Sequence, residues 1–363
     1  MKIGILTWYK ALNHGAVLQT YASCKLLEET GVTPVVLDFH WNIDSRSGVS
    51  GKLKRIVKKF SISQIVGHFR VKHALIEKRT VFQQFVNKKI PLGQDYSQET
   101  NLDAVYIGSD MVFDFSQGYN PFMYGKDVPC DFIFSYAASF GYTTIEKMEQ
   151  SEHKDEIIDA LKRFKAIGYR DKNTLDIINR YDINVPTFEC IDPVLCYGFE
   201  KEIEDWDKGQ WKDKHYIVIY AYDSTMNDAA TIKRIKGIAD DEGLEIISCG
   251  YYHKWCDKCV QASPDEFVEM IKHAKFVITD TFHGTVFATI MHKNFVSIIR
   301  TNGFKLKYFL EQSGLGDRIS DTEHPIEAVL HSNPDYHAFD NWLRKEREKS
   351  KMFIQSNIDE VRG

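Results

Sequence analysis

The sequence lacks long apolar runs, is poor in proline and has no regular cysteine pattern. No segment approaches the roughly 18 consecutive apolar residues that cross a membrane as a helix, which excludes a protein of that kind. With 9 prolines and 43% apolar residues, the 363-residue chain is neither collagen-like nor disordered. Residues 1–6 are typical of an opening strand and not of a signal peptide, so we expect a cytoplasmic protein.

The cysteines do not form a recognisable disulfide framework. There are seven, an odd number without regular spacing, which is typical of reduced thiols. Cys249, His253, Cys256 and Cys259 lie close enough in sequence to suggest the ligands of tetrahedral zinc. However, the spacing of the first two matches no established zinc motif. A loop with uninvolved thiols is the favoured interpretation, and we predict no metal.

Positive charge is concentrated in one segment. The net charge is −5, but residues 41–90 hold twelve lysines and arginines against two acids, which leaves −15 for the rest of the chain. Apolar residues interleave with these charges and predict basic amphipathic helices, which could contact the inner face of an anionic membrane or an anionic lipid-linked substrate. A solvated surface is the simpler alternative. No nucleic-acid-binding motif accompanies the charge, so we expect no nucleic-acid partner.

Short strands alternate with helices along the first half of the chain. A strand over 2–7, a helix over 13–30 and a strand over 35–39 predict a β-α-β unit with parallel strands. Three more apolar strands follow, each ending in small or polar residues. Because the carboxyl ends of parallel strands share one sheet edge, a binding site is expected there. The candidate residues at this edge are Asn13, His14, Gly15, Ser109, Asp110 and Arg170.

A second unit of the same kind follows a linker. The Gly-, Trp- and Lys-rich stretch from Asp192 to Lys214 is interpreted as that linker. Because the chain is too long for one ordinary core, we predict an α/β protein with two Rossmann-like domains facing a cleft. The first domain is predicted over 1–205 with a basic helical insertion at 41–90, the second over 206–334, and a C-terminal helix over 335–363 returning to the first.

The segment from Phe276 to Thr285 is the most informative part of the second unit. A short apolar run, two polar residues, a histidine and Gly-Thr predict a strand, a turn and the start of a helix. His283 would then lie beyond a strand end, where helix N–H groups attract anions and a general acid or base is useful. A structural histidine is the alternative.

Several motifs occur in one order along nearly the whole chain. They are Ile5-Leu6-Thr7, Asn13 to Gln19, Ile107 to Asp110, Ser135 to Gly141, Tyr169-Arg170-Asp171, Asp192-Pro193, Ser263 to Phe267, Thr279 to Thr285 and Gly314 to Arg318. Together they resemble the polysaccharide pyruvyl transferase family. The resemblance implies a fold similar to the GT-B glycosyltransferases. It also implies transfer of pyruvate from phosphoenolpyruvate to a surface-polysaccharide sugar or its lipid-linked oligosaccharide precursor, giving a cyclic ketal without a cofactor.

The resemblance also implies residue roles. His283 would act as acid or base, Asp280 would orient it or bind sugar, and Arg170 would hold the donor phosphate or carboxylate. Gly284 and Thr285 would offer N–H donors. The opposing wall would be lined by Asn13, His14, Gly15, Ser109 and Asp110.

The sequence departs from the family pattern near the candidate histidine. Many members carry Arg after the motif Asp, where this chain has Thr281, so a donor-binding cation would have to come from Arg300 or Lys305. Ala16, Met111 and Phe113 also replace usual residues. Two alternatives therefore stand beside the pyruvyl transferase: a GT-B glycosyltransferase using a nucleotide sugar, and a non-catalytic subunit of polysaccharide assembly.

Overall fold

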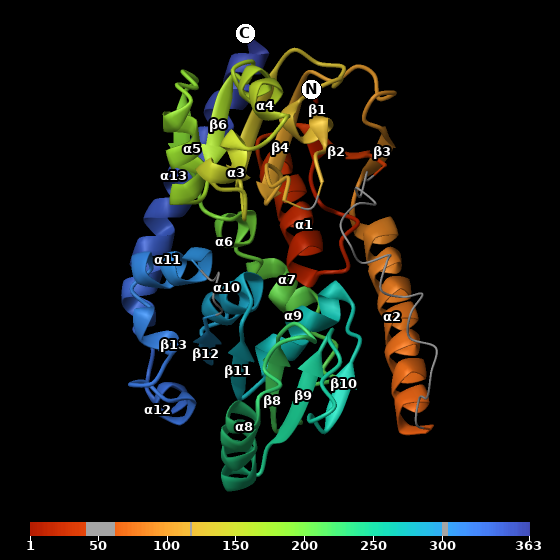
Figure 1. The fold of residues 1–363 in the computed structure, drawn as a ribbon, viewed down its shortest axis with the longest axis vertical. Coiled ribbons are helices and arrows are strands. Elements are labelled where there is room, and N and C mark those ends of the chain that lie inside the picture. Colours follow the sequence, from red (N-terminus) through yellow and green to blue (C-terminus); the bar gives the residue numbers. More distant parts are fainter. Residues whose placement is uncertain (41–61, 117, 300–303) are drawn as a thin grey trace.

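The chain folds around two parallel β-sheets. The computed structural model describes residues 1–40, 62–116, 118–299 and 304–363 (Figure 1). In these residues the first sheet has seven strands in the order β3-β2-β1-β4-β5-β6-β7. The strands are β1 (Lys2–Leu6), β2 (Thr33–Asp38), β3 (Leu92–Asp95), β4 (Ala104–Asp110), β5 (Ile133–Ala138), β6 (Ala166–Tyr169) and β7 (Thr187–Glu189). All pairs are parallel, and Ile5 pairs with Val36 on one side and Tyr106 on the other.

The second sheet has six strands in the described residues, in the order β10-β9-β8-β11-β12-β13. They are β8 (Tyr216–Tyr220), β9 (Glu245–Cys249), β10 (Lys258–Val260), β11 (Phe276–Thr279), β12 (Asn294–Ile298) and β13 (Ile319–Ser320). The central strands β8 and β11 are buried along their whole length, as expected for parallel strands covered on both faces. The sheets span residues 2–189 and 216–320, on either side of the predicted boundary at residue 205.

Helices cover both sheets. In the first part of the chain they are α1 (His14–Glu29), α2 (Ile62–Lys89), α3 (Ile145–Glu149), α4 (Lys154–Leu161), α5 (Lys172–Arg180), α6 (Pro193–Tyr197) and α7 (Glu200–Asp205), with a 3₁₀ turn, η1 (Pro121–Tyr124). In the second part they are α8 (Ala229–Glu242), α9 (Pro264–His273), α10 (Phe282–Ile290), α11 (Phe304–Gln312), α12 (Ile326–His331) and α13 (Tyr336–Arg362), with η2 (Gly316–Arg318).

The C-terminal helix α13 returns to the first domain, as predicted. In Figure 1 it runs in blue along the edge of both halves and ends near the N-terminus. Phe353 stacks on Phe188 of β7 at a ring-centroid distance of 5.4 Å, and the Ser350 hydroxyl accepts a hydrogen bond from the Ile191 N–H. The buried face of α13 is mostly apolar and its outer face is charged, the pattern of a helix packed on a core.

The segment interpreted as a linker contains more structure than predicted. Residues 193–205 form α6 and α7, and the Asp192 side chain caps α6 by accepting a hydrogen bond from the Val194 N–H. Asp before Pro at a helix start is a recognised N-terminal signal, because proline fits the first helical position. The prediction of a plain linker beginning at Asp192 was therefore wrong for this part.

The helix of the basic segment lies against the second domain. α2 extends beside β10 in Figure 1, and its Lys78 donates a hydrogen bond of 2.7 Å to the carbonyl of Gly250. The Lys78 ammonium also lies 4.0 Å from the centre of the Tyr251 ring. Burial lowers the pKa of Lys78 to about 8, against nearby Cys249 and Asp223. The predicted basic residues between 41 and 61 lie outside the described residues.

Candidate active site

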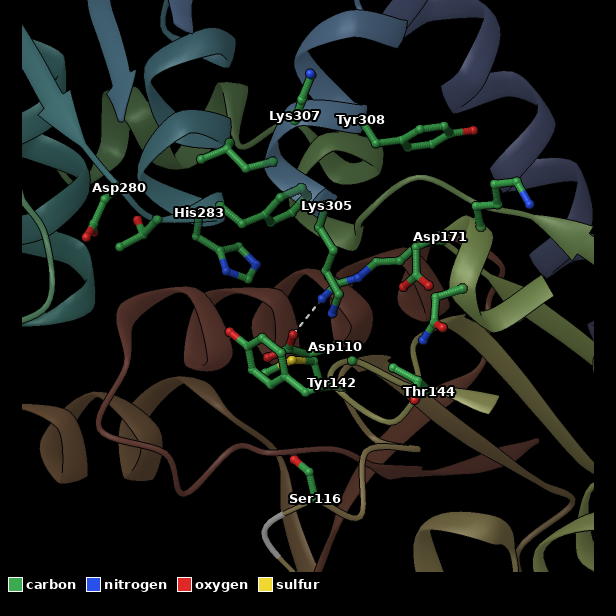
Figure 2. A pocket seen from close by; sticks show the side chains of 18 of the residues that line it. Asp110, Ser116, Tyr142, Thr144, Asp171, Asp280, His283, Lys305, Lys307 and Tyr308 are labelled. Atoms are coloured by element: carbon green, nitrogen blue, oxygen red, sulfur yellow. Dashed lines mark hydrogen bonds and ion pairs between the residues drawn. The ribbon is translucent and has the colours of Figure 1, made fainter. Parts of the chain in front are cut away.

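A cavity of about 920 Å³ lies between the two domains (Figure 2). Its walls come from segments that follow strand ends in both sheets and from the helices α3, α5 and α11. The first domain contributes Asn13, Asp110, Met111, Ser116, Gly141, Tyr142, Thr144, Lys147, Arg170, Asp171, Lys172, Asn173 and Asp176. The second contributes Tyr220, Tyr222, Asp280, Thr281, Phe282, His283, Lys305, Leu306, Lys307, Tyr308 and Glu311.

His283 is held in the first turn of α10. The Thr281 hydroxyl caps this helix by accepting a 3.0 Å hydrogen bond from the Gly284 N–H, and the Thr285 N–H bonds to the Thr281 carbonyl. The predicted donors of Gly284 and Thr285 are therefore already used within the protein. Thr281 therefore fixes the turn that presents His283 to the cavity.

Gly15 allows the two domains to meet at His283. A Cβ atom at position 15 would lie 2.1 Å from Nδ1 and 2.2 Å from Cγ of His283, far inside van der Waals contact. Only glycine lets the first turn of α1 approach the imidazole this closely. The sequence predicted Gly15 as a substrate-binding residue; the structure shows it packed against the candidate catalytic side chain.

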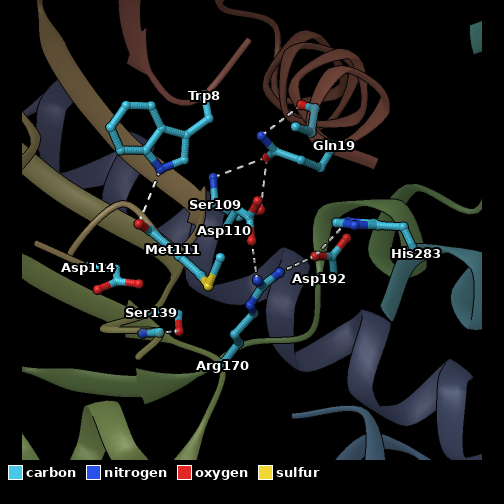
Figure 3. Close-up of polar contacts among 12 residues, drawn as sticks. Trp8, Gln19, Ser109, Asp110, Met111, Asp114, Ser139, Arg170, Asp192 and His283 are labelled. Carbon is cyan, nitrogen blue, oxygen red and sulfur yellow. Dashed lines mark hydrogen bonds and ion pairs between the residues drawn. The ribbon is translucent and has the colours of Figure 1, made fainter. Parts of the chain in front are cut away.

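A chain of charged side chains connects His283 to the first domain (Figure 3). The Arg170 guanidinium donates hydrogen bonds of 2.5 Å to both Asp110 and Asp192, and its carbon lies 5.1 Å from the centre of the Phe282 ring. Asp192 in turn lies 3.5 Å from Nε2 of His283. Asp192 is therefore a carboxylate that faces His283, and the orienting role of Asp280 stays a prediction.

The electrostatics of this chain keep both carboxylates ionised. Burial alone would raise the pKa of Asp192, but the charges of His283 and Arg170 outweigh it and lower that pKa. Burial likewise opposes ionisation of Asp110, and the neighbouring Arg170, His283 and Lys305 hold its pKa below the ordinary value. Arg170 is thus already paired with two carboxylates. For Arg170 to bind the donor as predicted, the donor would have to displace a buried ion pair.

Lys305 is a cation without a hydrogen-bond acceptor among the described residues. Its Nζ is buried in the cavity wall, and in Figure 2 the side chain extends from α11 towards Asp110. Burial and the charge of Arg170 lower the pKa of Lys305 to about 8. A buried ammonium beside His283 in a cavity is the arrangement that a phosphate or carboxylate of a ligand would complete.

Some of the other predicted residues line the cavity, and others lie away from it. Asn13 lines the cavity and caps α1, and its amide contacts the Tyr251 hydroxyl at 3.4 Å. Asp280 also lies on the cavity wall, where sugar binding stays a prediction. Ser109 is fully buried and donates to Gln19 (Figure 3), away from the cavity. Arg300 lies outside the described residues.

His14 is buried in an aromatic cluster and does not line the cavity. Its ring stacks on Phe267 at 4.8 Å and meets Phe82 edge-on, and Nε2 lies 2.9 Å from the carbonyl of Ala262. Burial and the nearby Lys78 lower the pKa of His14 to about 3, so the ring is neutral. The predicted substrate contact of His14 is therefore corrected to a packing role at the domain interface.

Sequence reasoning missed other cavity residues. Tyr142 and Lys147 come from the loop and helix after β5, and Lys307 and Tyr308 follow Lys305 on α11. The proximity of Tyr142 to the Ser135 to Gly141 motif could have indicated it. Lys307 and Tyr308 carried no comparable signal, because their position depends on how α11 packs.

The candidate zinc ligands do not come together. His253 is buried with Nε2 at 3.1 Å from the Ala221 carbonyl, and the thiol of Cys259 donates to the backbone of His253. Within the described ranges, no group of three or more His, Cys, Asp or Glu side chains could hold a metal ion. The arrangement of the described residues therefore gives the zinc alternative no support.

Comparison with known families accounts for the order of the motifs. A model of the polysaccharide pyruvyl transferase family matches residues 13–302. The chain belongs to this family. Its membership makes the protein a transferase and assigns it to polysaccharide pyruvylation in general terms. No curated protein sequence matches this pyruvyl transferase family member.

Solved structures of other proteins have a fold similar to that of this pyruvyl transferase family member. The UDP-GlcNAc 2-epimerase of Neisseria meningitidis bound to UDP-GlcNAc is similar over 99% of this chain and all of its own, at 9% identity and a TM-score of 0.51. A UDP-forming α,α-trehalose-phosphate synthase from Burkholderia xenovorans reaches a TM-score of 0.52 at 8% identity, covering 100% of this chain and 99% of its own. These similarities confirm the predicted GT-B-like architecture.

Across the described part of the chain, no helix has both the length and the apolar character needed to cross a bilayer.

Proposed function

We propose that the protein transfers pyruvate from phosphoenolpyruvate to a sugar of a polysaccharide or its precursor and forms a cyclic ketal. The observation that carries the proposal is that His283 and Lys305 line one interdomain cavity. His283 faces Asp192, and the buried ammonium of Lys305 has no hydrogen-bond partner among the described residues. The pair of His283 and Asp192 supports proton transfer, and Lys305 supplies a charge for an anionic donor.

The chemistry requires protons at defined atoms. One proton adds to the methylene carbon of phosphoenolpyruvate, and the first sugar hydroxyl forms a bond to the neighbouring carbon and loses its proton. The bond from that carbon to the phosphate oxygen then breaks, and the phosphate leaves with the electron pair. The second hydroxyl forms the other bond and loses its proton. One proton is consumed and two are released, and the surplus proton remains on the phosphate.

The described residues can serve these steps. The His283 ring lines the cavity, and its Nε2 lies 3.5 Å from Asp192, so the imidazole could deliver or accept a proton while this carboxylate supports it. The ionised Asp192 stabilises the protonated ring by its charge. Lys305 would bind the phosphate or carboxylate of the donor and stabilise the charge of the leaving phosphate.

A nucleotide-sugar glycosyltransferase is the second candidate, because the cavity is large. At about 920 Å³ it lies near the upper end of ordinary ligand sites, and Tyr220 and Tyr222 line its second-domain wall. The Neisseria epimerase of similar fold binds UDP-GlcNAc. A cavity of this size would also hold phosphoenolpyruvate together with an acceptor, so its volume does not displace the first proposal.

Membrane contact and a lipid-linked acceptor belong to the same proposal. On α2, the side chains of Leu75 and Ile76 are 41% and 55% exposed, and the exposed Arg79 follows within one turn. Apolar side chains next to a basic one on a surface helix favour adsorption to an anionic bilayer.

The test is turnover with a panel of acceptors. Purified protein is incubated with phosphoenolpyruvate and sugar nucleotides or lipid-linked oligosaccharides, and phosphate release is measured with mass spectrometry of the ketal. We expect release with wild type and a fall in kcat of about 10²–10⁴ in His283→Ala, the range typical of a lost general acid or base.

His292→Ala is the matched control, because His292 lies at the surface and pairs with Asp340. It should retain full turnover. No phosphate release across a broad panel would contradict the proposal. Thermal protection by a nucleoside diphosphate but not by phosphoenolpyruvate would favour the glycosyltransferase, and acceptor binding without any turnover would favour a non-catalytic subunit.

A further inference from the structure

A second cavity of about 250 Å³ adjoins the first. It lies between the end of β7, α11 and α13, and Phe282, Lys305, Tyr308 and Arg170 line both cavities. Its volume is below the roughly 300 Å³ at which pockets for drug-sized ligands begin. It therefore suits a small ligand or one ring of a longer one.

One wall of this second cavity is aromatic. Trp342 of α13 lines it half-buried, with ring-centroid distances of 5.9 Å to Phe309 and 6.1 Å to Phe339. Packing against these two rings fixes the orientation of the indole. A rigid aromatic face in a concave site is suited to the flat C–H face of a sugar ring.

The lining also carries hydrogen-bond acceptors. Glu189 at the end of β7 accepts a 2.9 Å hydrogen bond from the Tyr308 hydroxyl, and Glu346, about one turn after Trp342 on α13, pairs with Lys349 at 2.6 Å. Ionised carboxylates accept hydrogen bonds from hydroxyl groups and repel a ligand that is itself anionic. The lining balances the carboxylates Glu189, Asp192 and Glu346 with the cations Arg170, Lys305 and Lys349, a mixture that suits a neutral polyhydroxylated ligand.

The inner end connects this site to the chemistry. Asp192, which faces His283, lines the second cavity, and the buried Nζ of Lys305 stands at the border of the two cavities. A chain of sugars could therefore place one ring in the second cavity and the next in the main cavity.

We infer that the second cavity is a subsite for one neutral sugar ring of the acceptor, adjacent to the ring that reacts beside His283. The inference rests on the proposed function and names the place where the acceptor saccharide is held. It predicts that acceptor recognition depends on Trp342 and Glu189, whereas donor binding does not.

The experiment measures saccharide binding and turnover separately. Saturation-transfer NMR with methyl glycosides of common hexoses and their disaccharides gives binding without any reaction. We expect disaccharides to bind more tightly than monosaccharides in wild type, and Trp342→Ala and Glu189→Gln to remove that difference and weaken disaccharide binding about tenfold. Affinity for phosphoenolpyruvate, measured by calorimetry, should stay unchanged in both variants.

Met352→Ala is the matched control for α13, because this side chain is 71% exposed on the same helix and lies outside both cavities. It should bind like wild type. Binding in the His283→Ala protein separates the two proposals: a Trp342-dependent preference for disaccharides without turnover supports the subsite even if the transfer reaction fails. The subsite would be overturned if wild type bound no glycoside, or if Trp342→Ala and Glu189→Gln bound glycosides as tightly as wild type.

Discussion

The ammonium group of Lys305 lies where burial and a neighbouring cation oppose its charge and three carboxylates favour it. Burial and Arg170 lower its pKa to about 8, against Asp171, Asp110 and Asp114. Below that pH the group is charged and can bind an anion; as the pH rises through about 8 the charge is lost.

We therefore expect the affinity for phosphoenolpyruvate to fall from about pH 8 upward. Isothermal titration calorimetry between pH 7 and 9.5 would measure it. Lys305→Arg should keep its affinity across this range, because a guanidinium stays protonated. An equal decline in the arginine variant would assign the effect to another group.

A substitution at Gly15 tests the close contact between the two domains. Gly15→Ala places a methyl group on the His283 ring and should reduce kcat sharply, with a loss of about 1–3 kcal/mol in the free energy of unfolding from overpacking. Steady-state kinetics and urea denaturation would measure both.

Gly237→Ala is the control for this substitution, since a Cβ there meets no atom within 4 Å and position 237 lies inside α8. It should raise stability by about 0.5–1 kcal/mol through helix propensity and leave kcat unchanged. Normal turnover in Gly15→Ala would contradict the close packing around His283.

At the scale of elements, periodicity predicted what local sequence determines. The predicted strand over 2–7 and helix over 13–30 agree closely with β1 (Lys2–Leu6) and α1 (His14–Glu29), because apolar periodicity is a local signal. The roles of Gly15 and His14 were not predictable in this way. Both roles depend on contacts with side chains of the other domain. The sequence of the first turn of α1 contains no pattern that predicts these contacts.

Membrane adsorption through α2 can be tested by substitution. Replacing Leu75 and Ile76 by serine should reduce sedimentation with phosphatidylglycerol vesicles about tenfold, because two half-exposed apolar side chains no longer enter the bilayer. Thr80→Ser, on the exposed side of the same helix, should sediment like wild type. Membrane adsorption through this helix would be contradicted if the serine variant sedimented with the vesicles as wild type does, or if wild type sedimented equally with neutral phosphatidylcholine vesicles.

At the scale of the whole molecule, α13 joins the two domains. Phe353 is buried against the first domain, where it stacks on Phe188. Phe353→Ala should lower the free energy of unfolding by about 3–5 kcal/mol, as expected for a large buried side chain replaced by alanine. Urea denaturation followed by circular dichroism would measure the change.

The exposed neighbour Met352 provides the comparison, since Met352→Ala should change stability by less than about 0.5 kcal/mol. If Phe353→Ala unfolds like wild type, α13 contributes little to holding the domains together.

The contact between His283 and Asp192 crosses from one domain to the other, and this has a consequence for timing. The imidazole moves with α10, whereas Asp192, Arg170 and Gly15 move with the first domain. Any rotation that opens the cavity to admit substrates separates the histidine from its carboxylate. In the proposed reaction this arrangement would act as an interlock: the proton-transfer pair would be assembled only when the substrates are enclosed, and an activated donor would not be exposed to bulk water.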